Sequence, residues 1–376
     1  MPAHLKPCFV YCSMFPKDYE FDGDELVRLW MAQGYIQTRG SRRRMEDIGN
    51  EYFNDLQRRS FFDSFDSKFK MHDMIHDLAK SIAGNECWAI VDKKLLSLPD
   101  GVRHLYAQDE EEFGKSLCSY KYLRVLRTLL IQFRFSGLWD PNRSKIEISQ
   151  RIKFLPLLRC LRTLEFCCGR EDEIPDLLSN LKHLRYLRIM SDKIEKLPES
   201  ICLLYHLQTL VLDCPHFAEL PDGLDNLTNL RYLCIRTNKI EKLPESICLL
   251  YHLQTLVLNC PHLAELDGLD NLTNLRYLRI RTDKIEKLPK SICLLYHLQI
   301  LILGCWNLAE LPDGLGNLTN LRYLQIWNQQ ILYLPPGMGK LTNLQRLLIS
   351  CKVQGSIGVL KNLVNLESLH HRGCWS

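Results

Sequence analysis

The sequence predicts an α/β chain in which a small, mainly helical domain precedes a solenoid of stacked parallel strands. Two observations carry this prediction. From residue 161 onward one apolar template recurs every 22 or 23 residues, whereas residues 1–95 show helical periodicity without that repeat. We therefore expect one domain over 1–95, irregular first repeats over 96–160 and a regular array over 161–376.

Each regular repeat follows the template L-x-x-L-x-[LI]-x-(C or polar)-x-x-[LIF]-x-x-L-P-x-x-[ILM]-x-x-L, which is the leucine-rich repeat. Strand alternation places Leu233 and Ile235 in the core and Tyr232, Cys234 and Arg236 on the opposite, concave face of a parallel sheet. The rest of each unit returns along the convex side as turns or short helices, and stacking of neighbours stabilises the array. Full units begin at Leu161, Leu184, Leu207, Leu230, Leu253, Leu275, Leu298, Leu321 and Leu344, and a partial one begins at Leu366.

A longer period overlays the first. The segment KIEKLPESICLLYHLQTLVL occurs unchanged at 193–212 and 239–258, which indicates duplication of a cassette of two repeats. The next copy is one residue shorter, because 265–271 reads ELDGLDN where 219–226 reads ELPDGLDN. We expect a tighter convex turn there and an unchanged strand register.

The concave face is the predicted recognition surface, since solenoids present it to their partners and since Tyr, Trp and Arg are enriched at binding hot spots. The alternative is that the tyrosines only pack across strands and the arginines only solvate the sheet. The candidate protein-binding residues are Tyr186, Arg188, Tyr232, Arg236, Tyr277, Arg279, Arg281, Tyr323 and Trp327.

The sixteen cysteines recur in register with the repeats. None forms a Cys-x-x-Cys pair or a zinc-finger spacing with His, so we predict small, buried hydrophobic side chains and no metal site. The recurring positions are Cys202, Cys248 and Cys293 in one set, and Cys214, Cys260, Cys305 and Cys351, which follow the strands, in the other.

Composition excludes several classes of protein. Hydrophobic residues make up 46% and charged residues 24%, which is typical of globular chains rather than disordered or collagen-like ones. The charge balance, 48 − 44 = +4, does not suggest a nucleic-acid coat or a polybasic membrane anchor. No apolar run approaches the roughly 18 residues of a membrane span, and the first residues lack a secretory cleavage site. We expect a cytoplasmic protein, with nuclear or membrane-peripheral locations as alternatives.

Residues 1–95 predict helices and a hairpin. A first helix is capped by an Asp within Phe21–Glu25 and ends at Gly34. It is followed by a second helix near Met45–Arg59, by the segments SFFDSF and KFKM as a hairpin, and by a third helix from Asp73 to a stop at Gly84. Helices combined with a hairpin favour a winged-helix domain. The inward residues are expected to be Leu26, Leu29, Trp30 and Gln33 in the first helix, Ile48, Tyr52, Phe53 and Leu56 in the second, and Ile75, Leu78, Ala79 and Ile82 in the third.

Between these two regions, Gly101–Leu105 is expected to start the first strand of the repeats. The acidic run Asp109–Glu112 follows it. We interpret this run as a solvated loop, with contact to a basic surface as the alternative.

Three segments in this order, followed by the repeats, resemble plant disease-resistance proteins: CFVYCSMFPKDYEF at 8–21, ELVRLWMAQGYI at 25–36 and Met-His-Asp at 71–73. The resemblance is to the nucleotide-binding, leucine-rich-repeat immune receptors of the coiled-coil type, and it covers essentially the whole chain. It implies that the N-terminal domain is the winged-helix part of the NB-ARC nucleotide switch.

The resemblance also places His72 and Asp73 at the ADP-sensing position of that switch, where the His contacts the phosphates. Physically, Asp73 is a good N-cap, and the exposed amides of the first helical turn attract anions. A neighbouring His could donate to a phosphate. An ordinary capped helix is the alternative interpretation.

The family's phosphate cradle is missing from the sequence, which contains no G-x-x-x-x-G-K-[ST] segment. The full-length family uses ADP and ATP, and we expect no tight binding of either nucleotide by this chain. Both ends of the chain fall at positions that are internal in the family. We therefore expect a truncated receptor, a fragment gene or a partial gene model.

The resemblance implies a receptor fragment that recognises a pathogen effector or a guarded host protein and makes an autoinhibitory contact with the nucleotide switch. Asp22, Asp24 and Glu25 facing repeat arginines would supply part of that contact. The alternatives are a standalone repeat adaptor or decoy without a switch, and nucleic-acid binding by the winged helix through Arg42, Arg43 and Arg44. No nucleophile or phosphate-loop motif supports an enzyme.

Overall fold

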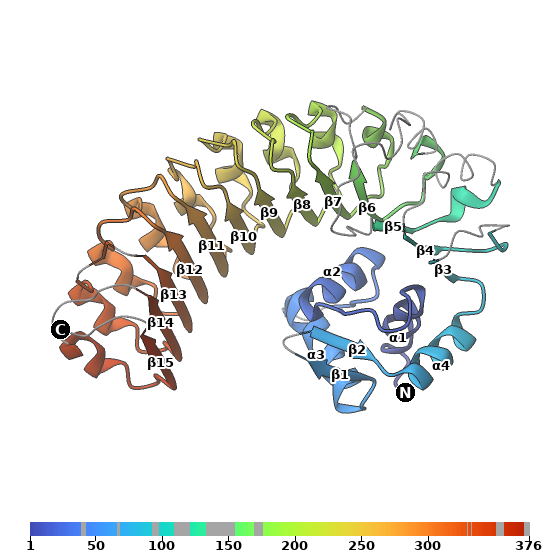
Figure 1. Ribbon diagram of the computed structural model, residues 1–376, viewed down its shortest axis with the longest axis horizontal. Helices are drawn as coiled ribbons and strands as arrows, with labels where there is room; N and C mark the ends of the chain where they lie inside the picture. The colour runs from blue at the N-terminus through green and yellow to red at the C-terminus, as the bar shows by residue number, and fades with distance from the viewer. Residues whose placement is uncertain are drawn as a thin grey trace, which may run out of the picture. The chain divides into compact units, whose positions relative to one another are not determined.

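A computed structural model describes residues 1–38, 43–65, 68–91, 98–108, 121–132, 155–168, 176–328, 330–331, 333–350 and 357–371. The described part confirms the predicted α/β class, with thirteen strands in one sheet ordered β15 to β3 as along the sequence (Figure 1). The chain divides into two compact units. The N-terminal unit comprises Met1–Gly169, Pro175–Ile189 and His206–Thr209, and the C-terminal unit comprises Arg170–Ile174, Met190–Tyr205 and Leu210–Ser376.

The first part of the N-terminal unit contains the three predicted helices and the predicted antiparallel hairpin. A further short helix precedes them and was not predicted. The elements are α1 (Lys6–Tyr11), the 3₁₀ turn η1 (Cys12–Met14), α2 (Gly23–Gln33), α3 (Met45–Arg58), β1 (Phe62–Phe65), β2 (Lys68–Met71) and α4 (Asp73–Ala83).

The caps of α2 are of the predicted kinds, an Asp at the start and Gly34 at the end, and the structure selects Asp22 rather than Asp24 as the N-cap. The Asp22 carboxylate accepts a hydrogen bond from the Glu25 amide at 2.9 Å, and Gly34 ends the helix in the left-handed region at φ 78°. All four predicted inward residues of α2 are buried, and so are Val27, Met31 and Ala32. The helix is therefore enclosed on more than one side.

Two expectations for α4 are wrong. Its N-cap is His72, whose Nδ1 accepts from the Met74 amide at 3.4 Å, while Asp73 takes the first helical position. Leu78 and Ile82, expected to face inward, are 50% and 41% exposed. The buried side carries His76 instead, and its Nε2 pairs with the Phe15 carbonyl oxygen at 2.8 Å.

The first parallel strands also belong to the N-terminal unit. The sheet begins at β3 (Cys87–Ile90), one strand before the expected start, and β3 pairs in parallel with β4. The acidic run 109–112 lies outside the described residues. The other elements are β4 (His104–Gln108), η2 (Lys121–Val125), β5 (Thr128–Gln132), η3 (Leu155–Leu157), β6 (Thr163–Cys168), η4 (Asp176–Asn180) and β7 (Tyr186–Ser191), whose last two residues are assigned to the C-terminal unit.

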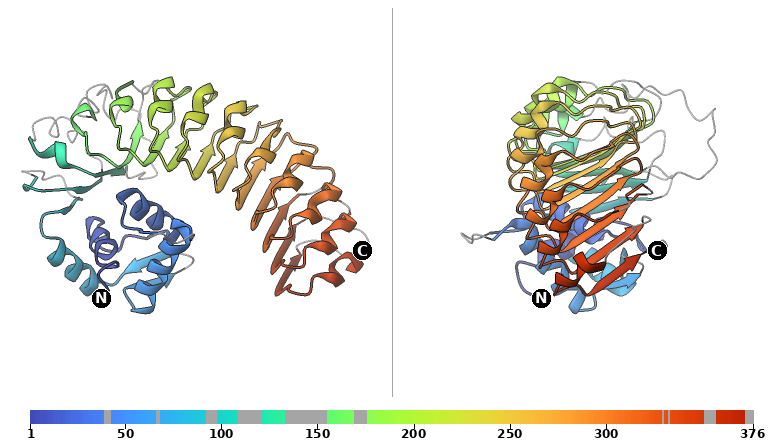
Figure 2. Two further views of the ribbon diagram at one scale, coloured as in Figure 1. Left: turned by 180° about the vertical axis from the view of Figure 1, so that it is seen from behind. Right: turned by 90° about the vertical axis from the view of Figure 1, so that its left-hand side faces the viewer.

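In the C-terminal unit the strands lie side by side on one surface, and short 3₁₀ segments line the opposite one, as the template predicts (Figure 2). The strands are β8 (Thr209–Asp213), β9 (Tyr232–Arg236), β10 (Thr255–Asn259), β11 (Tyr277–Thr282), β12 (Ile300–Cys305), β13 (Tyr323–Trp327), β14 (Arg346–Ser350) and β15 (Ser368–His371). The 3₁₀ segments are η5 (Glu199–Leu203), η6 (Asp222–Asn226), η7 (Glu245–Leu249), η8 (Leu269–Asn271), η9 (Lys290–Leu294), η10 (Asp313–Asn317), η11 (Pro336–Lys340) and η12 (Ile357–Asn362).

The turn position after each strand is buried and carries either Cys or a small polar residue. Cys214, Cys260 and Cys305 are at most 1% exposed, which confirms the predicted role of these cysteines. Asn328 takes the same position two strands after Thr282. It donates to the Leu308 carbonyl oxygen at 2.9 Å and accepts from the Ile331 amide at 2.6 Å, so the polar members satisfy backbone groups inside the turns. Cys351 lies outside the described residues.

The shortened repeat behaves as expected. Its 3₁₀ segment η8 has three residues where η7 has five. Gly268, at φ +76°, takes the N-cap position that proline takes in η5, η6, η7, η9, η10 and η11. The register is kept, since Thr255 pairs with both Tyr232 and Tyr277. The deletion is therefore absorbed on the convex side.

Gly268→Ala is expected to destabilise the C-terminal unit by about 2 kcal/mol. The left-handed backbone alone accounts for roughly 1–2 kcal/mol, and the added Cβ would lie 2.7 Å from the Cys248 Sγ. Gly101→Ala is the matched control, because Gly101 has φ +86° with nothing within 4 Å of its Cβ position. Urea unfolding followed by circular dichroism measures both losses, and adding Cys248→Ala should recover the difference. Equal losses at the two glycines would contradict the close approach.

Within the described ranges, no helix combines the length and the apolar character that a membrane crossing requires.

Candidate functional site

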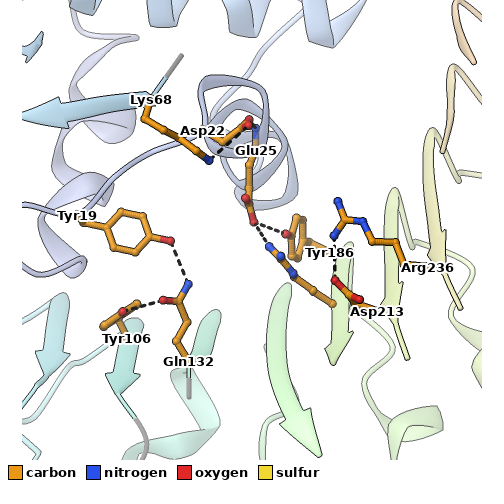
Figure 3. Close-up of polar contacts among 10 residues, drawn as sticks. Tyr19, Asp22, Glu25, Lys68, Tyr106, Gln132, Tyr186, Asp213 and Arg236 are labelled. Carbon is orange, nitrogen blue, oxygen red and sulfur yellow. Dashed lines mark hydrogen bonds and ion pairs between the residues drawn. The ribbon is translucent and has the colours of Figure 1, made fainter. Parts of the chain in front are cut away.

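The helix α2 lies against the first repeats within the N-terminal unit, and Glu25 is the centre of their polar contact (Figure 3). Its Oε1 accepts a hydrogen bond from the Tyr186 hydroxyl at 2.9 Å and forms an ion pair with the Arg188 Nη1 at 2.7 Å. The Glu25 and Arg188 side chains are only 26% and 22% exposed. This pair is therefore largely removed from water, unlike most surface ion pairs.

A second carboxylate, Glu165 on β6, is buried beside this pair and is 3% exposed. Burial raises the pKa of Glu165 to about 7; Arg188 lowers it and Glu25 raises it. Burial opposes the charge of Arg188, but the two carboxylates outweigh that effect and raise its pKa. The Arg188 guanidinium thus interacts with both carboxylates. Glu165 nevertheless keeps its proton to a higher pH than an exposed carboxylate does.

Gln132 on β5 connects this group to the segment before α2. Its Nε2 donates to the Tyr19 hydroxyl at 3.0 Å, and its Oε1 accepts from the Tyr106 hydroxyl at 2.9 Å (Figure 3). Burial raises the pKa of Tyr19, so this hydroxyl stays protonated and available as a hydrogen-bonding group.

A second polar layer lies at the other end of α2. The Gln33 Nε2 donates to the hydroxyls of Thr128 and Thr163, both at 2.9 Å, so one amide spans β5 and β6. His104 lies between the Tyr35 hydroxyl, 3.0 Å from its Nε2, and the Thr128 hydroxyl, 2.9 Å from its Nδ1. Burial lowers the pKa of His104 to about 3, so the ring is neutral and bonds through both nitrogens.

Of the three acidic residues expected to face repeat arginines, only Glu25 does so among the described residues. Asp22 is used as the N-cap of α2 and lies 4.0 Å from Lys68, and Asp24 is exposed. The helical rotation of about 100° per residue explains this result, because it turns Asp24 away from the face that carries Glu25.

The predicted concave column differs along its length. Tyr186 is 1% exposed and bound to Glu25, whereas Tyr232 and Tyr277 are half-buried on a small apolar cluster in the C-terminal unit. That cluster consists of Val211, Cys234 and Val257. Cys234 lies on the concave side, as predicted, but it has no exposed surface. It belongs there to a second small core.

Among the other candidate residues of the C-terminal unit, one arginine has an acidic partner. Arg236 donates to Asp213 at 2.9 Å. The Arg279 guanidinium lies 6.0 Å from the centroid of the Trp327 ring, at the outer range of a cation–π contact. Tyr323 donates to Gln325 at 2.8 Å, and Arg281 is exposed.

His72 and Asp73 both lie exposed at the beginning of α4. The His72 ring is turned onto the amide of its own helix, and the Asp73 carboxylate adds negative charge at the helix start. Among the described residues, the contact that the His72 ring makes is therefore that of a helix cap. Among them there is also no group of three or more potential metal-binding side chains.

The basic run of the winged helix is engaged within its own domain. Arg43 pairs with Glu51, and the Arg44 Nε donates to Asp47 at 3.0 Å. Arg42 lies outside the described residues. These pairings reduce the charge that Arg43 and Arg44 could present to a phosphate backbone.

A family model described as the disease resistance protein winged helix domain matches residues 14–79, and one described as a leucine-rich repeat region matches residues 259–372. The chain is related to plant disease-resistance proteins. Similar relatives are putative disease resistance RPP13-like protein 1 of Arabidopsis thaliana, 36% identical over 210 residues, and disease resistance protein RGA2 of Solanum bulbocastanum, 45% identical over 87 residues. These matches cover 55% and 22% of this chain, but only 19% and 9% of the relatives.

Two solved structures share the repeat fold. One is the ectodomain of the plant receptor kinase GASSHO1/SCHENGEN3 from Arabidopsis thaliana with CASPARIAN STRIP INTEGRITY FACTOR 2 (TM-score 0.52, 21% identity, 73% of this chain and 36% of that one). The other is the TLR13–ssRNA13 complex (TM-score 0.53, 20% identity, 72% and 44%). At this identity they show the fold alone.

The disease-resistance winged helix thus supplies Glu25 and Gln33, and the repeats supply their partners. The sequence carried a signal for part of this interface: Gln33 is a polar residue on the otherwise apolar side of a helix, and Glu165 interrupts an apolar strand. His104 and Thr128 gave no such signal, because either side chain is ordinary at the start of a strand.

Proposed function

We propose that this chain is a recognition and regulatory part of a plant immune receptor. In this proposal its repeats bind a pathogen effector or a guarded host protein, and its winged helix is restrained by the first repeats. The observation that carries the proposal is the coordination of Glu25 by Tyr186 and Arg188. The relationship to disease-resistance proteins supports the immune role.

The contact has the properties of a restraint that a binding event could release. It consists of polar side chains reaching from α2 to β5, β6 and β7, and its charges are mutually dependent through Arg188. A ligand that displaced Arg188 would leave two neighbouring carboxylates without their cation. Release would thereby be an all-or-none step rather than a gradual loosening.

The nucleotide belongs to the proposal only through the family. His72 and Asp73 would contribute one edge of an ADP site, and the phosphate cradle would have to come from other residues. Equilibrium dialysis of the purified chain against labelled ADP should show no binding at micromolar concentration. Tight binding would contradict this part of the proposal. We place the chain in the cytoplasm and infer no enzymatic activity.

Charge reversal tests the restraint. Arg188→Glu should raise amide hydrogen exchange in α2, and the exchanged pair Glu25→Arg with Arg188→Glu should restore protection. Expressed transiently in leaves, the single variant should change defence-gene induction relative to wild type, whereas Lys242→Glu, at a residue that is 70% exposed, should not. Unchanged exchange in the single variant would reject the restraint.

The alternative function is a standalone repeat adaptor or decoy. It predicts that Arg188→Glu alters hydrogen exchange but leaves defence output and binding of an effector unchanged. The two readouts of the same variant therefore separate the alternatives.

A further inference from the structure

The sheet face of the C-terminal unit has an uneven charge distribution. Strands β8–β14 carry four arginines and one acidic residue, Asp213, although the chain as a whole is nearly balanced at 48 basic to 44 acidic residues. Asp213 is paired with Arg236. The remaining three arginines are Arg279, Arg281 and Arg346.

Among the described residues, none of these three arginines forms an ion pair. Elsewhere in the chain basic side chains on repeats do find acids, as Arg188 does with Glu25 and Lys242 with Glu265. The lack of ion pairs at Arg279, Arg281 and Arg346 is therefore specific to these strands and is not general to the repeats.

The local packing holds two of these arginines in place. Arg279 and Arg281 lie two residues apart on β11, so both project from the same face. Arg281 pairs in register with Gly304, and its Cγ lies 3.5 Å from the position that a Gly304 Cβ would take, so the stem of Arg281 covers the bare backbone. Arg279 lies 6.0 Å from the Trp327 ring. The stem of Arg281 thus lies against β12, and the guanidinium of Arg279 lies near the Trp327 ring of β13.

Resting on the proposed recognition function, we infer that this surface binds a partner-protein segment carrying at least two Asp or Glu side chains beside an apolar or aromatic residue. We call it the β11–β13 arginine patch, formed by Arg279, Arg281 and Trp327. Two guanidiniums that pair with no acid among the described residues match two carboxylates, and the Trp327 ring near Arg279 offers an apolar surface beside them.

Single-stranded nucleic acid fits this surface less well. It requires a continuous basic groove with aromatic rings free to stack on successive bases. Here Tyr277 packs on the Val211–Val257 cluster and Tyr323 is bonded to Gln325. The patch thus offers a few fixed charges instead of a stacking platform.

The test uses the purified full chain and a fluorescein-labelled peptide of twelve residues, rich in Glu and containing Leu and Tyr, with an amidated C terminus. The matched probes are the same peptide with Gln for every Glu, the acidic peptide with a free C terminus, and a dodecamer of single-stranded DNA. Fluorescence polarisation at two salt concentrations gives the affinities.

The acidic peptide should bind, the Gln peptide should not, and Arg279→Gln with Arg281→Gln should weaken binding by at least about tenfold, with an affinity that falls as salt rises. Lys242→Gln with Lys287→Gln removes the same charge from exposed residues outside the strands and should change the affinity less than about twofold. Circular dichroism checks folding of both variants.

Equal binding of the acidic and Gln peptides, tighter binding of the DNA, or an unaffected Arg279→Gln and Arg281→Gln variant would overturn the inference. Binding only when the C terminus is free would assign the patch to a terminal carboxylate and would likewise overturn the proposed acidic segment. Because the restraint at Glu25 is measured separately by hydrogen exchange in α2, failure of the patch leaves the proposed function standing.

Discussion

Arg188→Met should lower the free energy of unfolding of the N-terminal unit by about 2–3 kcal/mol. Methionine keeps an apolar stem but removes the guanidinium, which leaves Glu25 and Glu165 facing each other without a cation. Breaking a fully buried ion pair costs about 3–5 kcal/mol, and the residual exposure of 22% and 26% reduces that figure here. Chemical denaturation combined with hydrogen exchange in α2 and β6 measures the effect.

Arg236→Met is the matched control for this experiment. Arg236 makes the same type of contact, with Asp213 at 2.9 Å, but the two side chains are 42% and 36% exposed. Exposed pairs contribute about 0–1 kcal/mol, so the control should lose less than about 1 kcal/mol. Similar losses in both variants would show that burial of the Glu25–Arg188 pair has no special weight.

The second large effect concerns pH. The pKa of Glu165 is about 7 in the folded chain against 4.5 in an exposed carboxylate, so the folded state binds the extra proton between these values. Stability from this group is therefore present in full below about pH 4.5 and is lost as the pH rises through about 7. The shift corresponds to about 3 kcal/mol across that window.

Glu165→Gln isolates this contribution, since glutamine resembles the protonated acid and does not titrate. Below pH 5 the variant and the wild type should have similar free energies of unfolding, and at pH 8 the variant should be the more stable. The difference between the two curves removes the effect of all other carboxylates. A difference that does not change with pH would contradict the raised pKa of Glu165 and would locate the titration elsewhere.

The repeats show how much a strong sequence pattern can predict. Strand positions, the buried turn cysteines and the preserved register around Gly268 all follow from a template whose period leaves one arrangement for the leucines. The burial of Cys234 does not follow from the template, because strand alternation predicts the face on which a side chain lies but not which side chains cover that face. Flanking valines and tyrosines decide its burial.

The contact between the winged helix and the repeats was much less predictable. Opposite charge indicated that an acid of α2 would meet a repeat arginine, but it could not separate Glu25 from Asp22 and Asp24, which lie within three residues. Capping and helical rotation make that selection. The orientation of α4 was missed for a similar reason: apolar spacing did not show that His76 would face the core, where it bonds to Phe15, while Leu78 and Ile82 stay exposed.

The duplicated cassette of two repeats gives the array a defined unit of growth. Copies 193–212 and 239–258 are identical, and the register continues through a copy that has lost one residue. Inserting or deleting a cassette would therefore move everything beyond it by two strand spacings, roughly 10 Å, without altering any local fold. The number of strands in the C-terminal unit can therefore change in steps of two, so that the length of its strand face varies while each repeat keeps its fold.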